Sequence, residues 1–210
     1  MTKTGPVGTW LAIAFLRGDD RLFKDRLITA VTTGPFVHTE VLIGRDGESL
    51  RQARAYASFE GVSGFTPSRS FHKQTGCSTL GTNKDDSWEV IKYPLPAGGY
   101  ERACAAMLQI LAADLPYNHR DLWQCFIPVC LPFENDLDCE RPETWKASGG
   151  TFCSQAALLI LRRLSRLHVV SLSCQIIPRV EHTNSRGCSP NDLFRMLTQA
   201  PHGQNDEKKT

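Results

Sequence analysis

Hydrophobic residues recur three and four positions apart in the last third of the chain, which is the pattern of an amphipathic helix. Over residues 151–167 the apolar positions are Ala157, Leu158, Leu161, Leu164 and Leu167. The same spacing directs Arg162, Arg163 and Arg166 toward solvent. Cys153 stands in the first turn of this predicted helix, directly after a flexible Ser-Gly-Gly-Thr lead-in.

The first half of the chain carries runs of apolar and β-branched residues that predict strands. We expect strands over residues 10–15, 36–44, 49–57 and 87–93. The second and third of these form a hairpin, because Asp46-Gly47 between them is a strong turn signal.

Periodicity and capping residues predict further helices. One covers residues 21–33 with Asp20 as its cap, and another covers 100–113 with an apolar face of Cys104, Met107, Leu108 and Leu111. A short helix starts within residues 115–126, and 128–150 form a long loop. A last helix begins with Ser189 as cap, Pro190 at the first position and Asp192 three residues after the cap.

Length and charge narrow the classes of function. The chain has 210 residues, 41% of them hydrophobic, enough for a single domain over residues 1–200 followed by a polar tail at 201–210. A net charge of +2, without a concentrated basic run, does not indicate a nucleic-acid groove. The apolar run 10–16 is too short to span a membrane and is no signal peptide, so we expect a cytoplasmic protein.

Eight cysteines stand at positions 77, 104, 125, 130, 139, 153, 174 and 188. None forms a Cys-x-x-Cys pair, and the histidines are not spaced beside cysteines as in zinc clusters. We therefore expect no metal and no cofactor, and most of these cysteines to be chemically inert.

Cys153 has two interpretations. A free cysteine is usually a small apolar residue buried in a core. Alternatively, the positive end of the helix stabilises a thiolate and lowers the thiol pKa, which produces a nucleophile.

A thiolate nucleophile needs a base within hydrogen-bond reach. His168 falls at the far end of the Cys153 helix, about 22 Å away at 1.5 Å per residue, so it cannot act as the base for Cys153. His38 lies near the start of a predicted strand, and alternation places Glu40 on its face. Glu40 is then a possible orienting partner. The alternative is that His38 is an ordinary structural histidine and Glu40 a solvated strand residue.

Four motifs in this order carry a family resemblance: "FVHTEVLIG" from residue 36, "PYN" at 116–118, "TFCSQAALLIL" from 151 and "SPNDLFRML" from 189. Together they resemble the circularly permuted NlpC-like branch of the papain-fold thiol hydrolases. The resemblance implies an α+β papain-like fold, in which an antiparallel sheet packs against the helix that carries the nucleophile. It also implies that the His-bearing strand precedes the Cys-bearing helix.

By this resemblance Cys153 matches the nucleophile and His38 the general base. A hairpin that turns at Asp46-Gly47 brings residues 54–56 opposite His38, and the third catalytic residue stays open among Glu40, Ser58 and Tyr56, in that order.

The resemblance implies a cysteine peptidase or amidase that acts through a thioester on a peptide, amide or acyl-lipid substrate. A lipid-directed thiol acyltransferase or esterase of the same fold is the alternative enzyme. A non-catalytic binding module that kept the fold is the alternative outside enzymes.

Overall fold

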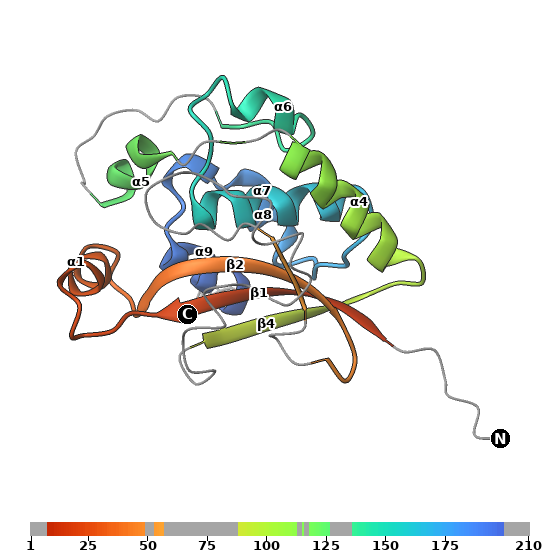
Figure 1. The fold of residues 1–210 in the computed structure, drawn as a ribbon, viewed down its shortest axis with the longest axis horizontal. Coiled ribbons are helices and arrows are strands. Elements are labelled where there is room, and N and C mark those ends of the chain that lie inside the picture. The colour runs from red at the N-terminus through yellow and green to blue at the C-terminus, as the bar shows by residue number, and fades with distance from the viewer. Residues whose placement is uncertain are drawn as a thin grey trace, which may run out of the picture.

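The computed structural model describes residues 8–48, 53–56, 88–112, 115, 118–126 and 136–199. The predicted polar tail at 201–210 lies outside these residues. Within them, four strands form one antiparallel sheet and the longer helices α4 and α7 gather over one side of it (Figure 1). The α+β class and the antiparallel sheet are therefore confirmed.

The sheet has the strand order β3-β2-β1-β4. Strand β1 (Thr9–Arg17) pairs on its two sides with β2 (Phe36–Arg45) and β4 (Trp88–Leu95), and β2 also pairs with β3 (Arg54–Tyr56). The strands predicted at 10–15, 36–44 and 87–93 are confirmed to within a few residues. Of the return strand predicted at 49–57, residues 53–56 are described, and β3 covers three of them.

Strand β1 is apolar from Trp10 to Leu16, as expected of a strand with both faces buried. Leu11, Ile13 and Phe15 point into the main core, which the helices complete on one side of the sheet. Its alternate residues, including Ala12 and Ala14, join a smaller cluster on the opposite side.

The turn predicted at Asp46-Gly47 is present. Gly47 has a φ of 87°, a left-handed conformation that glycine adopts at no steric cost, and the N–H of Glu48 donates to the carbonyl of Arg45 at 3.0 Å.

The register predicted for the hairpin is wrong. Tyr56 pairs with Val41 and Arg54 with Ile43, so residues 54–56 do not lie opposite His38. In a hairpin closed by a two-residue turn at 46–47, residue 50 would pair with Ile43, so the observed pairing is shifted by four residues.

The helices follow in chain order. They are α1 (Phe23–Val31), α4 (Gly99–Ala112), α5 (His119–Phe126), α6 (Pro142–Trp145), α7 (Cys153–Arg166), α8 (Ile177–His182), the 3-10 helix η2 (Ser185–Gly187) and α9 (Pro190–Thr198). The helix predicted within 115–126 is α5. The loop predicted over 128–150 contains the short helix α6, and its residues 128–135 lie outside the described part.

Helix starts illustrate how local signals succeed and fail. Helix α9 begins as predicted, with Ser189 as N-cap accepting from the N–H of Asp192. Asp20 does not cap α1, whose N-cap is Leu22 without a side-chain hydrogen bond. The start of α1 is instead fixed from within the helix, because the carboxylate of Asp25 accepts the N–H of Asp19 at 2.9 Å.

Helix α4 forms where it was predicted, but its buried face differs. Ala103, Met107 and Ile110 are buried, whereas Leu108 is 46% exposed. Consecutive residues are about 100° apart around a helix, so Met107 and Leu108 cannot both face the core centre.

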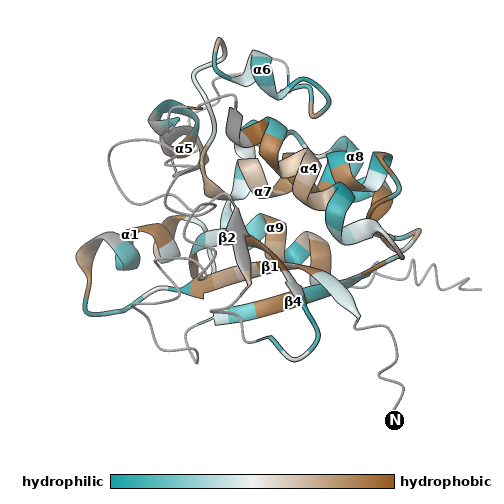
Figure 2. Cartoon of the chain, turned by 45° about the vertical axis from the view of Figure 1, so that its right-hand side comes forward, coloured by the Kyte–Doolittle hydropathy of each residue, from teal (hydrophilic) through white to brown (hydrophobic). Residues whose placement is uncertain are grey.

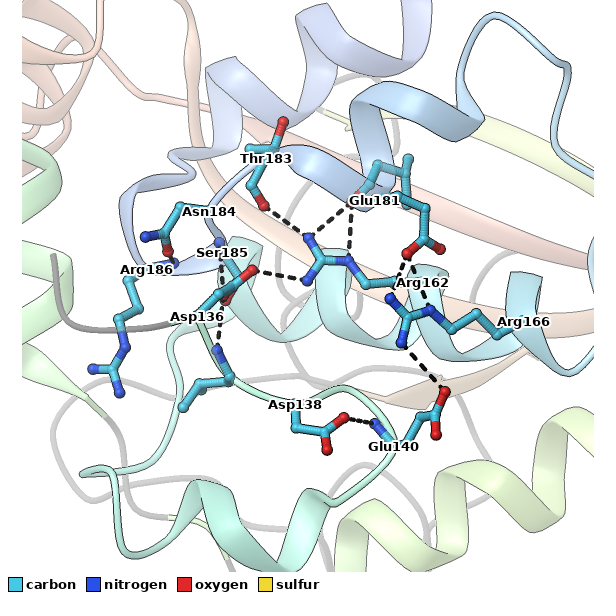
Figure 3. Close-up of polar contacts among 12 residues, drawn as sticks. Asp136, Asp138, Glu140, Arg162, Arg166, Glu181, Thr183, Asn184, Ser185 and Arg186 are labelled. Atoms are coloured by element: carbon cyan, nitrogen blue, oxygen red, sulfur yellow. Dashed lines mark hydrogen bonds and ion pairs between the residues drawn. The ribbon is translucent and has the colours of Figure 1, made fainter.

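Helix α7 forms the centre of the main core, and this overturns two sequence predictions. Leu167 is exposed, and Arg162 is buried rather than solvated. The Arg162 guanidinium donates to the carbonyls of Val180 and Thr183 and contacts the Asp136 carboxylate at 2.8 Å (Figure 3). Because α8 and the Asp136 segment cover this side of α7, a charge there is stabilised by buried acceptors rather than by water.

Candidate active site

The chain bends sharply before it enters α7. Gly149 and Gly150 have φ values of 91° and 86°, in the left-handed region that favours glycine. The N–H of Gly150 donates to the carbonyl of Trp145 at 2.8 Å, which closes the bend. The two glycines of the lead-in are therefore required by the backbone path that delivers Cys153.

Cys153 is the first residue of α7, and Phe152 is the N-cap. The side chain of Gln155 fixes this start. Its oxygen accepts the N–H of Phe152 at 3.3 Å, and its amide nitrogen donates to Asp121 at 3.2 Å. Asp121 in turn contacts Arg186 at 3.0 Å. A buried polar network thus holds the first turn of α7 in place.

The structure brings Cys153 and His38 together. The two side chains are close enough that each shifts the pKa of the other through hydrogen bonding and charge, and the backbone N–H groups of Thr39 and Ser154 further favour the charged form of Cys153. His38 Nε2 lies 3.2 Å from Glu40 Oε1. One ring nitrogen of His38 therefore faces Glu40, which leaves the other for the sulfur.

Glu40 lies beside His38, and it is not a solvated strand residue. Its side chain is fully buried, whereas that of His38 keeps 14% of its surface exposed. Alternation along β2 places the two side chains on the same face of the strand, where they are in contact. There the ring of Trp88 meets the His38 ring edge-on, with 6.2 Å between centroids.

The pKa values of the pair move in opposite directions. Burial alone lowers the pKa of His38, but hydrogen bonds and charges from Cys153 and Glu40 outweigh it and raise the pKa of His38 to about 10. Burial alone raises the pKa of Cys153, but the hydrogen bond and charge of His38, with the N–H groups of Thr39 and Ser154, lower it below its usual value. The pair is therefore stabilised as thiolate and imidazolium.

Other buried cysteines lack this stabilisation. Burial raises the pKa of Cys125 to about 12, and it also raises the pKa values of Cys139 and Cys188. Burial is the largest cause of the raised pKa in each of these three thiols, and it is the contact with His38 that separates Cys153 from them.

The predicted exposure of Cys153 is wrong. The residue is 2% exposed, because the first turn of α7 lies within the main core. The exposed part of the pair is the His38 side chain.

The remaining candidates do not join the pair within the described residues. Ser58 lies outside them. Tyr56 is placed only as a backbone partner of Val41. His168 follows the C-terminal end of α7, opposite Cys153, as predicted.

One residue that sequence reasoning missed holds the start of β2. The buried amide of Asn191 accepts the N–H of Phe36 at 2.9 Å, and donates to the Phe36 carbonyl at 2.9 Å and to the Thr32 hydroxyl at 2.6 Å. It thereby anchors the segment that leads to His38.

The Asn118–Asp121 spacing was an available signal for α5, since Asn118 accepts the N–H of Asp121 at the start of that helix.

No family model, curated protein or solved structure matches the chain. In the part of the chain that the structure describes, no group of three or more metal-ligating side chains is placed to hold an ion. None of the helices described is long and apolar enough to cross a bilayer.

Proposed function

We propose that the protein is a cysteine hydrolase that cleaves an amide or ester, with Cys153 as nucleophile, His38 as acid and base, and Glu40 as the orienting group. The observation that carries this proposal is the buried contact between Cys153 and His38, which shifts their pKa values in opposite directions. Perturbed, mutually coupled groups of this kind are typical of catalytic sites.

The reaction follows from the charges of the pair. The Cys153 thiolate attacks the substrate carbonyl carbon, and the N–H groups at the start of α7 stabilise the oxyanion that forms. The His38 imidazolium then gives its proton to the leaving amine or alcohol as the bond to carbon breaks, which leaves a thioester on Cys153. Water attacks the thioester, His38 takes the water proton, and the thiolate departs from the released acid.

A permuted papain-like arrangement is part of the proposal. The strand bearing His38 precedes the helix bearing Cys153, and that helix packs on β2 of an antiparallel sheet. The order and the packing support the NlpC-like resemblance. Peptides and other amides are our first choice of substrate.

A covalent intermediate provides the direct test. We expect the protein, incubated with activated acyl esters and anilides, to gain the mass of the acyl group on Cys153, and peptide mapping locates the adduct. Cys153→Ala should show neither adduct nor turnover. A protein that folds and forms no adduct with any of these acyl donors would favour the binding module instead.

The role of Glu40 predicts a shift of the pH profile. Glu40 raises the pKa of His38, so Glu40→Gln should lower that pKa. The alkaline limb of the activity profile should then move to lower pH, by on the order of one pH unit. For the wild type we expect this limb near pH 10, where His38 loses its proton. Turnover should fall less than in His38→Ala, and an unchanged alkaline limb would show that Glu40 does not act on His38.

A further inference from the structure

Helix α1 presents its hydrophobic residues outward. Leu22, Phe23, Leu27 and Val31 are exposed by 45%, 79%, 43% and 37%, while Asp25 and Thr32 are buried. Three of these, Phe23, Leu27 and Val31, recur every four residues and form one stripe. Four of the seven large hydrophobic residues that are exposed in the described part of the chain thus lie on or next to this helix.

Specific contacts fix this inverted orientation. The Asp25 carboxylate accepts the N–H of Asp19 beneath the helix, and the Thr32 hydroxyl donates to the carbonyl of Ile28 and accepts from Asn191. Rotating α1 to bury the apolar stripe would break these bonds and leave polar groups without partners. The apolar face is therefore held toward the outside.

A pocket of about 500 Å³ opens along the same helix. Its lining residues are Asp20, Phe23, Arg26, Leu27, Thr29 and Ala30. Helix α1 lies at one end of the molecule, apart from the helices that cover the sheet (Figure 1), and carries hydrophobic residues there (Figure 2).

We propose that α1 docks the protein onto an anionic lipid surface, with Phe23, Leu27 and Val31 inserted among the lipids. Short amphipathic helices bind such surfaces when an apolar face is flanked by basic residues. Arg21 and Arg26 are exposed beside the stripe, and the one acidic residue of α1, Asp25, is buried. Asp19 and Asp20 are also exposed, but they precede the helix, so among the described side chains the exposed charge on the helix beside the stripe is that of Arg26.

A lipid surface suits this face better than a second copy of the chain. A stable dimer buries about 800 Å² on each partner. Four side chains, three of them less than half exposed, fall well short of that area. A protruding phenylalanine needs no shaped partner to enter a bilayer interface.

The position of α1 links docking to the reaction, and this link rests on the proposed function. The C-terminal end of α1 leads through Gly34 and Pro35 into β2, and Asn191 joins the two elements. His38 is the third residue of β2, so docking would bring the candidate active site close to the lipid surface. The acyl donor would then be an amphiphile presented at that surface.

Vesicle co-sedimentation tests the proposal. The purified chain should bind vesicles of phosphatidylcholine with phosphatidylserine more strongly than vesicles of phosphatidylcholine alone. Phe23→Ser should weaken partitioning at least about tenfold, since it removes the most exposed apolar side chain of the stripe from the lipid contact. Arg26→Gln should weaken it about fivefold. Leu108→Ser is the matched control, because Leu108 on α4 is about as exposed as Leu27, and it should bind as the wild type does.

Leu27→Ser serves as a second variant of the stripe and should also weaken binding. The lipid proposal would be overturned by equal binding of Leu27→Ser and Leu108→Ser, by a wild-type chain that binds no vesicles, or by a dimer in sedimentation velocity that Phe23→Ser dissociates. Two readouts separate this proposal from the hydrolase proposal. Cys153→Ala should bind vesicles normally, and Phe23→Ser should hydrolyse a water-soluble short-chain ester at the wild-type rate.

Discussion

Replacement of His38 by alanine is expected to lower turnover by about 10²–10⁴-fold, the usual contribution of a positioned acid–base group. The imidazolium supplies both the hydrogen bond and the positive charge that lower the Cys153 pKa. Without them burial dominates, and the pKa of Cys153 should rise above its usual value, as burial raises those of Cys125 and Cys188. The protein would then hold a neutral thiol and no proton donor for the leaving group.

Circular dichroism and steady-state kinetics on the same preparation check this expectation. We expect the His38→Ala protein to stay folded, because the His38 side chain lies beside the smaller cluster and is partly exposed. His182→Ala is a suitable control, since His182 ends α8 and lies away from the first turn of α7 in the chain. Loss of the fold with unchanged thiol reactivity would show that His38 is a structural residue.

Asp121→Asn should destabilise the protein by about 3–5 kcal/mol, the range for breaking a buried ion pair by removing one partner. The Asp121 and Arg186 side chains are only 3% and 6% exposed, and they lie 3.0 Å apart. The substitution removes the carboxylate that Arg186 contacts and disturbs the hydrogen bond from Gln155 to Asp121. Equilibrium urea denaturation measures the change in the free energy of unfolding.

A surface pair supplies the matched control for Asp121. Asp138 lies 3.7 Å from Arg141, with side chains 48% and 70% exposed. Exposed pairs contribute about 0–1 kcal/mol, so Asp138→Asn should leave stability nearly unchanged. Equal effects of the two substitutions would mean that the Asp121 network does not brace α7.

Local signals in the sequence predicted the elements that they control. The Ser189 cap with Pro190 places α9, and the apolar spacing places α7 with Cys153 in its first turn. Alternation put His38 and Glu40 on one face, and the two side chains are in contact.

Properties that depend on distant partners could not be predicted in this way. Arg162 is buried because Asp136 and the carbonyls of α8 surround it, and none of these is its neighbour in sequence. The outward stripe of α1 depends on Asn191, more than a hundred residues away in the chain. The register of β3 depends on the length of a connection that turn residues alone do not determine.

The burial of Cys153 also followed from tertiary packing. A helix start suggested an exposed thiol, but the first turn of α7 enters the main core. The lowered pKa of Cys153 therefore depends on hydrogen bonds and on the charge of His38, which must offset the burial.

The pH dependence of Cys153 alkylation tests the central claim most directly. Limiting iodoacetamide is applied across a pH series, and mass spectrometry of the digested protein gives the rate at each cysteine. We predict that Cys153 reacts ahead of the other cysteines at about pH 6, where an ordinary thiol is mostly protonated, and that His38→Ala abolishes this preference. Uniform labelling at that pH, or labelling of Cys104 or Cys125 ahead of Cys153, would contradict the assignment of Cys153 as an activated nucleophile.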